Sequence, residues 1–229
     1  MHPLDNVIWQ ALTTRQTGFA ESFGEACRFL RDVTSLTSFS EPNDQGYKSL
    51  AGLVGSKGTA ALFLDDPFPG REGWSVVGGA PLVQMVCENG NAESAPNQCE
   101  AVEISPLGTV HSPQMMELTA LTKPGPFGCR THELGTYLGI WRDGKLAAMA
   151  GERLKVAGHT EVSAVCTHPD HLGKGYAGLL MSEIMKGIRQ RGETPFLHSR
   201  ADNARAIALY ERLGFHIRKR GHYVVIRND

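Results

Sequence analysis

The residues best placed to do chemistry form a short glycine loop, Leu172-Gly173-Lys174-Gly175-Tyr176-Ala177. The loop follows an apolar segment and precedes a stretch in which apolar residues recur at helical spacing. The first N–H groups of a helix have no partner within it, and the helix dipole places partial positive charge there. Glycines let a ligand approach those groups, so the order strand, loop and helix favours a phosphate or pyrophosphate site. The glycines alone are equally compatible with a tight turn.

Two other nucleotide-binding patterns fit this loop poorly. Gly173, Gly175 and Gly178 match G-x-G-x-x-G, but a dinucleotide-binding unit also needs an acidic residue about 20 positions further on, after the next strand. That segment ends in Leu197-His198-Ser199, without a carboxylate. A Walker A loop, G-x-x-x-x-G-K-[ST], is matched neither here nor at Gly55-Ser56-Lys57. A dinucleotide-dependent oxidoreductase is therefore disfavoured.

The elements that must position the loop are predicted from hydrophobic periodicity in the second half of the chain. Asp143-Gly144 indicates a hairpin turn between two of the strands. The predicted strands are Ala101–Ser105, Tyr137–Trp141, Leu146–Val156, Thr160–Thr167 and Pro195–Ser199, with a closing hairpin of Phe215–Arg218 and Tyr223–Ile226; the predicted helices are Pro113–Leu121, Ala177 to Gly192 and Asn203–Leu213. This order predicts an α/β or α+β fold with a sheet flanked by helices.

The first half is less regular. Helices are predicted at Asp5–Leu12, with Asp5 or Asn6 as N-cap, and at Gly46–Val54. Strands are predicted at Thr59–Leu64 and Pro81–Cys87. The polar stretch 88–98 has hardly an apolar anchor, so we expect a smaller N-terminal α/β region over residues 1–98 and a second domain over 99–229.

Composition limits the classes of protein. The chain has 229 residues, 41% hydrophobic and 21% charged, with a formal net charge of -1, which is typical of a soluble globular protein and disfavours nucleic-acid and membrane partners. The longest apolar runs are too short to span a bilayer, and the N-terminus does not read as a signal peptide. The five cysteines lack C-x-x-C spacing, so we expect no disulfide framework, no metal site and a cytoplasmic location.

Two motifs together resemble the GNAT superfamily of N-acetyltransferases. The glycine loop is similar to the family's pyrophosphate-binding pattern [QR]-x-x-G-x-[GA], and residues 203–215 are similar to its N-x-x-A-x-x-x-Y-x-x-x-G-F helix. The resemblance covers roughly residues 100–229, and the closing strands are similar to those of enzymes related to glycine acyltransferases. Residues 1–98 resemble no family that we can name. One alternative is that they form a degenerate GNAT-like half. Leu172 departs from the pattern, because the family usually has Gln or Arg there.

The resemblance implies a GNAT-like fold with a mixed, mostly antiparallel sheet. It implies an acyl-CoA-dependent N-acyltransferase that moves acetyl from acetyl-CoA to a primary amine of a small molecule or peptide by direct attack. The strand Glu161–Thr167 would splay from Pro195–Ser199, and pantetheine would pair with the backbone in the gap. Backbone N–H groups near Val165 or Cys166 would stabilise the oxyanion. The coenzyme would be bound by Val165, Cys166, Thr167, Leu172, Gly173, Lys174, Gly175, Tyr176, Ala177 and Asn203.

The same resemblance suggests two catalytic residues. Tyr210 is the candidate general acid that returns a proton to the thiolate, although its helical spacing with Ile207 and Leu213 also fits plain packing. Glu161 is the candidate general base, because an amine of lysine type has a pKa near 10.4 and must lose a proton. A solvated strand-edge residue is the alternative for Glu161, and a helix N-cap is the alternative for Asn203.

Other readings stay open at this stage. Cys166 with His168 permits a covalent acyl-cysteine route, although a buried core cysteine fits better. Arg130, His132 and Glu133, in the segment 123–133, either contact a polar acceptor or are surface charges. A non-catalytic acyl-CoA-binding regulatory module is the alternative function. The acceptor and the oligomeric state, a homodimer included, are not determined.

Overall fold

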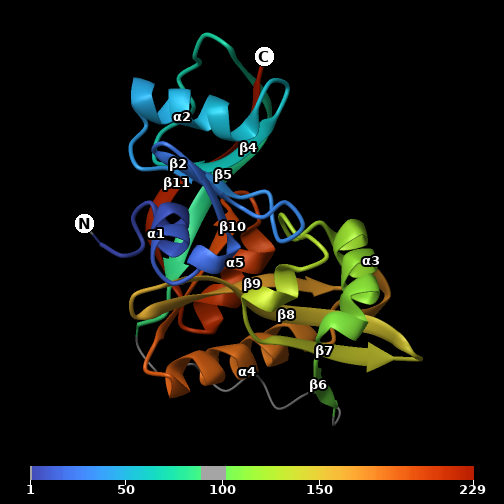
Figure 1. Ribbon diagram of the computed structural model, residues 1–229. Helices are drawn as coiled ribbons and strands as arrows, with labels where there is room; N and C mark the ends of the chain where they lie inside the picture. Colours follow the sequence, from blue (N-terminus) through green and yellow to red (C-terminus); the bar gives the residue numbers. More distant parts are fainter. Residues whose placement is uncertain (1, 89–101) are drawn as a thin grey trace.

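The computed structural model describes residues 2–88 and 102–229, and within them eight strands form one continuous sheet (Figure 1). The strand order is β4-β11-β5-β10-β9-β8-β7-β6, and a separate small sheet has the order β1-β2-β3. Every strand pair is antiparallel except β9 with β10. The mixed, mostly antiparallel sheet flanked by helices that the sequence predicted is confirmed.

The bounds of the elements follow the chain. In the first part they are α1 (Val7–Thr13), β1 (Ala20–Phe23), β2 (Ala26–Phe29), β3 (Thr37–Phe39), α2 (Asp44–Val54), β4 (Thr59–Leu64) and β5 (Trp74–Val86). In the second part they are β6 (Ile104–Pro106), α3 (Ser112–Thr122), β7 (Tyr137–Arg142), β8 (Lys145–Val156), β9 (His159–Thr167), α4 (Tyr176–Gln190), β10 (Thr194–Arg200), α5 (Ala204–Arg212) and β11 (His216–Asn228). Single 3-10 turns lie at Thr17–Phe19, Thr109–His111, Thr131–Leu134 and Pro169–His171.

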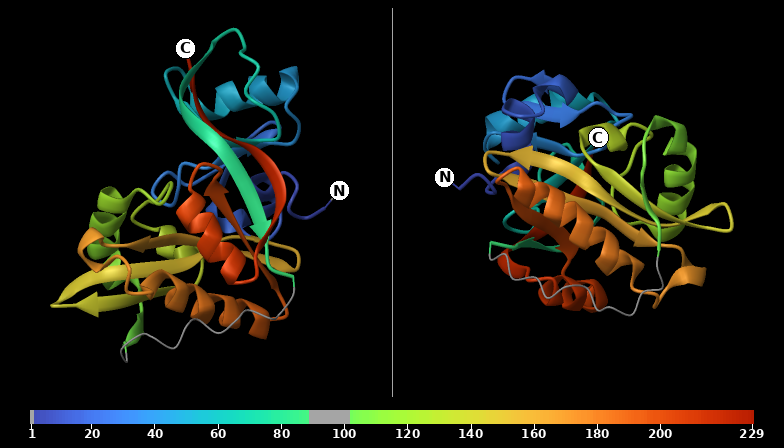
Figure 2. Two further views of the ribbon diagram at one scale, coloured as in Figure 1. Left: turned by 180° about the vertical axis from the view of Figure 1, so that it is seen from behind. Right: turned by 90° about the horizontal axis from the view of Figure 1, so that it is seen from below.

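Strand β5 joins the two halves of the chain in one sheet. It lies between β10 and β11 and pairs with both, and the long β5 and β11 run side by side in the view from behind (Figure 2). The main sheet therefore contains strands from both sides of the predicted domain boundary. Residues 89–101, where most of that boundary was placed, and Ala101 of the predicted strand Ala101–Ser105 lie outside the described residues.

The predicted closing hairpin is wrong. Residues 216–228 form the single long strand β11, which pairs with β5 along its length and with β4 from Arg227 to His222. The predicted turn fell between Arg218 and Tyr223, at Lys219-Arg220-Gly221-His222. This segment continues as strand because β5 supplies a partner there, with only a register shift between Ile217 and Lys219.

The two faces of the sheet carry different helices. Helices α4 and α5 cover one face, where Leu180, Ile184 and Tyr210 pack with Leu197 of β10. Helix α1 lies on the other face, where Ile8 and Leu12 pack with Phe196. Burying one large aliphatic side chain contributes about 1.5–3 kcal/mol, so both layers hold β10 firmly in place.

Helices α4 and α5 begin and end close to their predicted positions. Leu180, Met181, Ile184 and Ile188 form the buried side of α4, at the helical spacing read from the sequence. Gly192 follows α4 with a φ of 73°, a left-handed conformation that glycine adopts at low cost. The side chain of Asn203 caps α5 by accepting from the N–H of Ala206 at 3.2 Å.

Candidate active site

The parallel pairing of β9 with β10 stops after three residue pairs. Thr194, Pro195 and Phe196 face His159, Thr160 and Glu161, and beyond them β10 continues alongside β5 alone. The β10-facing edge of residues 162–167 therefore has no strand partner among the described residues, although β8 pairs with the other edge. The splay predicted between these two strands begins at Glu161.

A bulge marks the open part of β9. Cys166 faces Met149 and Ser163 faces Gly151, so Ala164 and Val165 together oppose one residue of β8. Ala164 has a φ of 52°, which is uncommon for a residue other than glycine. The bulge changes the direction of the main-chain groups of β9 at the position where Val165 and Cys166 were predicted to contact the thioester carbonyl.

The glycine loop leaves main-chain donors unused at the start of α4. The N–H groups of Gly173, Gly175, Tyr176 and Ala177 donate to no group in the part of the chain that the structure describes. The N–H of Leu172 is different, since it reaches the Pro169 carbonyl at 3.3 Å. Gly175 is the N-cap residue, no side chain caps the helix, and its first turn carries no acidic residue. These donors and the helix dipole suit an anion such as a pyrophosphate.

Both glycines of the loop have left-handed backbone. Gly173 has a φ of 81° and Gly175 a φ of 78°, and a side chain on Gly173 would meet open space. Glycine is therefore favoured at these positions because it adopts the left-handed backbone at low cost. Its missing side chain also leaves the surface of the loop open to a ligand. Leu172 is exposed and contributes no polar side chain where the family pattern has Gln or Arg.

Tyr210 lies on α5 among the side chains that pack α4 against the sheet. Its ring is 6.3 Å from that of Phe215, and its hydroxyl makes no hydrogen bond within the described residues. Burial raises the pKa of Tyr210 to about 12, so the hydroxyl stays protonated at neutral pH. The packing role is evident in the structure, and the acid role stays a prediction.

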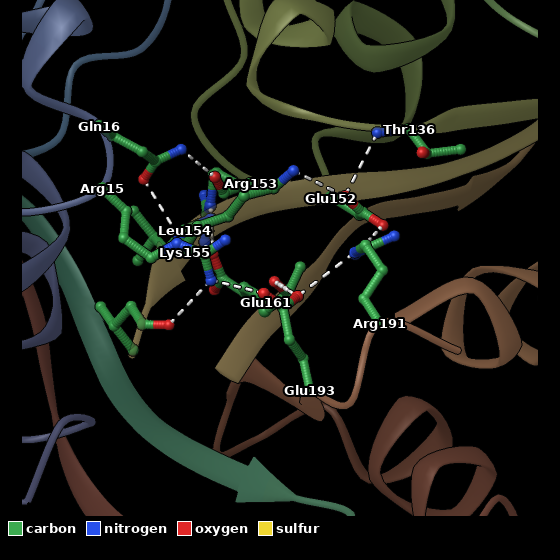
Figure 3. Close-up of polar contacts among 12 residues, drawn as sticks. Arg15, Gln16, Thr136, Glu152, Arg153, Leu154, Lys155, Glu161, Arg191 and Glu193 are labelled. Atoms are coloured by element: carbon green, nitrogen blue, oxygen red, sulfur yellow. Dashed lines mark hydrogen bonds and ion pairs between the residues drawn. The ribbon is translucent and has the colours of Figure 1, made fainter. Parts of the chain in front are cut away.

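Glu161 is not the solvated strand-edge residue considered from the sequence. It is fully buried, and Arg153 donates to its two carboxylate oxygens at 2.8 Å each (Figure 3). Burial raises the pKa of Glu161, but the charge and hydrogen bonds of Arg153 and the hydrogen bond from His198 outweigh that effect and lower the pKa to about 2. A carboxylate held in this way is a weak proton acceptor, so the geometry favours a buried ion pair over the base role predicted for Glu161.

A second buried carboxylate lies beside the first. Glu152 of β8 is paired with Arg191 at 2.8 Å and with Lys155 at 3.0 Å (Figure 3). Sequence analysis missed Glu152, Arg153 and their partners, although two adjacent charges inside the apolar strand Leu146–Val156 were a visible signal. Charges at such positions must be paired, because an unpaired buried charge is strongly destabilising.

Cys166 matches the core-cysteine reading. Its thiol is buried, and burial raises the pKa of Cys166 to about 11, which leaves little thiolate at neutral pH. The Nδ1 atom of His168 accepts from the N–H of Asp170 at 3.3 Å and makes no hydrogen bond to Cys166. The structure therefore gives no support to an acyl-cysteine route.

The segment 123–133 contacts the N-terminal region. Arg130 is paired with Glu133 at 2.7 Å and with Asp32 at 3.1 Å, and the hydroxyl of Thr131 donates to the Val33 carbonyl. His132 is buried, with Nε2 3.2 Å from the hydroxyl of Thr109. These contacts join the two parts of the chain, and none of these residues lines the pocket described next.

A pocket of about 550 Å³ lies on the α1 side of the sheet. Its walls come from the segments around α1, β3 and β4 and from the strands β5, β10 and β11. His198 of β10 is part of the wall, two residues beyond the last pairing of β10 with β9. Sequence analysis did not single out His198 or this pocket.

Comparison with known proteins identifies the family. A crystal structure of a protein described as a GNAT-family acetyltransferase, from Novosphingobium aromaticivorans, is 33% identical and superimposes with a TM-score of 0.88 over 100% of both chains. The chain belongs to the GNAT family. The model of the FR47-like protein family also matches residues 137–224. A GCN5-related N-acetyltransferase from Kribbella flavida shares the fold at 17% identity, with a TM-score of 0.63 over 98% of this chain and 96% of that one.

A curated relative of this GNAT protein is the alanine N-acetyltransferase of ribosomal protein bS18 from Escherichia coli K12. The two are 36% identical over 77 residues, which is 33% of this chain and 51% of the relative. The chain thus spans about half the length of the curated relatives it matches. No described helix is long and apolar enough to cross a membrane, and the described residues contain no group of three or more His, Cys, Asp or Glu side chains placed to hold a metal ion.

Proposed function

We propose that this protein is an N-acetyltransferase that transfers the acetyl group of acetyl-CoA to a primary amine. The observation that carries the proposal is the opening between β9 and β10, which starts at Glu161 and leads along β9 to the uncapped N-terminus of α4. A strand edge without a strand partner, followed by an anion site, matches the two parts of coenzyme A, an amide-containing arm and a pyrophosphate. Membership of the GNAT family supports the same assignment.

The residues of the glycine loop bind the pyrophosphate in this proposal. The N–H groups of Gly173, Gly175, Tyr176 and Ala177 are unused, and the helix dipole adds favourable charge. The N–H of Leu172 donates to the Pro169 carbonyl, so Leu172 supplies no free main-chain donor to the site. Val165, Cys166 and Thr167 offer the edge of β9 to the pantetheine arm, and Lys174 and Asn203 stay predicted contacts.

The reaction is direct acyl transfer. When bound, the coenzyme supplies a thioester whose carbonyl carbon forms a bond to the amine nitrogen while its bond to sulfur breaks. Main-chain N–H groups at the bulge of Ala164 and Val165 stabilise the negative charge that develops on the carbonyl oxygen. Tyr210, which is protonated at neutral pH, donates its proton to the departing thiolate.

A binding measurement tests the coenzyme site. Gly173→Ala places a side chain at a φ of 81°, which an L-residue adopts at a cost of about 1–2 kcal/mol, and we expect the Kd for coenzyme A to rise about tenfold by calorimetry. Gly158→Ala is the matched control, because Gly158 has a φ of 69° in open space in the turn between β8 and β9. Equal Kd values for the two variants would remove the loop from the site.

A thiol-release assay with acetyl-CoA tests the activity. The amine library includes a peptide with an N-terminal alanine, because the curated relatives are named for that acceptor, together with small alkyl- and arylamines. We expect Tyr210→Phe to lower kcat about 100-fold with an unchanged Kd for the coenzyme. Coenzyme binding without turnover of any amine would favour a non-catalytic acyl-CoA-binding module, and unchanged turnover in Tyr210→Phe would exclude that hydroxyl as the acid.

A cytoplasmic location is part of this proposal. Cys27, Cys129 and Cys166 form no disulfide within the described residues, and a reducing compartment keeps thiols in that state.

A further inference from the structure

His198 lines the pocket and lies two residues beyond the last pairing of β10 with β9. Its neighbour Leu197 packs with α4, so His198 faces the opposite side of the sheet, where the rings of Phe63 and Phe196 lie 4.5 and 5.8 Å away. Its side chain is only 5% exposed, yet it lines the pocket of about 550 Å³. A histidine so placed is reached from the pocket and is otherwise enclosed by the fold.

The hydrogen bonds around His198 define which ring nitrogen carries the proton. Arg218 can only donate, and it donates to Oε1 of Gln84 at 2.8 Å, so the other amide atom of Gln84 is the nitrogen. That nitrogen donates to the Leu4 carbonyl at 3.0 Å and lies 3.1 Å from Nε2 of His198. Nε2 therefore accepts a hydrogen bond and is unprotonated, while Nδ1 carries its proton toward Oε1 of Glu161 at 2.7 Å.

This arrangement prepares the imidazole to accept a proton. The unprotonated Nε2 is on the side of Gln84, which also lines the pocket, and the buried carboxylate of Glu161 stabilises the positive charge that protonation of the ring creates. Arg153 keeps Glu161 ionised and fixed in place by two hydrogen bonds. A histidine oriented by a buried carboxylate is a recurrent arrangement for a general base.

We propose that His198 is the general base of the acetyl transfer, that Glu161 is its positioning residue, and that the pocket admits the acceptor amine. The proposal rests on the proposed function and replaces Glu161 as the proton acceptor. The amine's ammonium form gives one proton to Nε2 of His198, in the place now taken by the N–H of Gln84. The neutral nitrogen then attacks the thioester and loses a second proton to solvent as the amide forms and the bond to sulfur breaks. That proton balances the one that Tyr210 gives to the thiolate and regains from solvent, and His198 releases its own proton to solvent after the product leaves.

The pocket also limits the class of amine. Its wall combines charged side chains with the apolar and aromatic side chains of Leu4, Ile8, Phe39, Tyr47, Phe63 and Leu82, and the two aromatic rings of Phe63 and Phe196 lie beside His198. A volume of about 550 Å³ accepts a small molecule or the first residues of a peptide. We therefore assign as acceptor a primary amine that carries a compact apolar or aromatic group.

The test compares two amines of similar shape with acetyl-CoA as donor. Benzylamine is protonated at neutral pH and must lose a proton before it attacks, whereas aniline is already neutral. In His198→Gln we expect kcat for benzylamine to fall about 100-fold at pH 7 and that for aniline to fall by less than about tenfold. The matched control is His216→Gln, which removes a surface histidine 3.7 Å from Glu88 and should leave both rates unchanged.

The pH profile separates the base from its positioning residue. The charged groups linked to His198 by hydrogen bonds and ion pairs are Glu161 of β9, Arg153 of β8, Arg218 of β11 and Asp5 before α1. The pocket wall adds the charged side chains of Glu41, Asp65, Asp66, Lys219 and Arg220. In His198→Gln the acidic limb of kcat for benzylamine should disappear, and kcat should rise with pH as the free amine fraction rises. Glu161→Gln removes only the carboxylate that accepts from Nδ1 of His198, so that variant should keep an acidic limb and lose less rate than His198→Gln.

Two further measurements distinguish a failure of this inference from a failure of the proposed function. The Kd for coenzyme A, measured for every variant, reports folding and the proposed function, and it should change by less than about twofold. Nitrogen NMR of the wild-type protein should show His198 protonated on Nδ1, with a shift at Nε2 when benzylamine is added. Equal losses for the two amines, a proton on Nε2, or no response of His198 to benzylamine would overturn the inference even if coenzyme binding and turnover of another amine were found.

Discussion

The two ends of strand β9 differ in how completely they are bound. Residues 159–161 pair with β10, and His159 and Thr160 also pair with β8. Glu161 lies opposite a bulge of β8 at Arg153 and Leu154 and is held by Arg153 and His198 in a buried cluster. Residues 162–167 have β8 on one side only, contain a bulge at Ala164, and lead to the loop with unused N–H groups. One strand thus combines a closed end, residues 159–161, with an open end, residues 162–167.

This difference indicates how the sheet keeps a site open without losing its register. An unpaired strand edge inside a sheet invites closure, since its N–H and C=O groups can find partners in the neighbouring strand. The buried ion pair of Glu161 with Arg153 lies at the point of divergence and fixes β9 against β8, while β5 holds β10 on its other side. The charges at the closed end therefore support the geometry of the open end.

The largest expected effect comes from breaking the closed end. Arg153→Met leaves Glu161 buried without its main partner, and we expect the free energy of unfolding to fall by about 3–5 kcal/mol in chemical denaturation. Arg130→Met, which removes a surface arginine paired with two carboxylates, is the matched control and should have a much smaller effect. The double variant Arg153→Met/Glu161→Leu should recover part of the loss, and a single variant as stable as the control would show that the cluster does not anchor β9.

The next effect is the pH dependence of stability. Because the pKa of Glu161 is lowered from 4.5 to about 2 in the folded protein, its contribution is fully present above pH 4.5 and is lost as the pH falls toward 2. This contribution is roughly 3 kcal/mol. In Glu161→Gln that part of the acid dependence should be missing from urea denaturation curves recorded between pH 5 and 2. An unchanged acid dependence would show that Glu161 titrates normally and that the closed end is not held by its charge.

The smallest expected effect is at the bulge of the open end. Glycine inside a strand costs about 0.5–1 kcal/mol relative to alanine, but Ala164 already has a φ of 52°, so Ala164→Gly should change stability by less than about 0.5 kcal/mol. The matched control is Ala148→Gly in β8, a fully buried alanine opposite Ile140 and Thr167. It should lose about 1 kcal/mol or more in the same thermal or chemical denaturation. Equal losses at the two positions would contradict a relaxed left-handed bulge at Ala164.

Much of the fold was predictable because local patterns agreed with it. The strand Thr59–Leu64 was predicted with its observed bounds, and α4 and α5 follow their apolar spacing and their terminal residues Asn203, Gly192 and Gly214. The long strand β5 was recognised only over its second half, because Gly78 and Gly79 interrupt the β pattern. The small strands β1, β2 and β3 were not predicted, since each is only three or four residues long.

The sequence by itself determined the glycine loop, the helix that follows it and the family to which the chain belongs. The loop, the helix and the family motifs depend on residues that are close together in the chain. Local backbone preferences and the spacing of apolar residues therefore make them recognisable in the sequence. Tertiary structure decided the partners of Glu161, the direction of His198 and the pocket beside it. Arg153, Glu161, His198 and Gln84 come from four different strands, and a carboxylate's proton affinity is set by the charges and burial that those strands bring together.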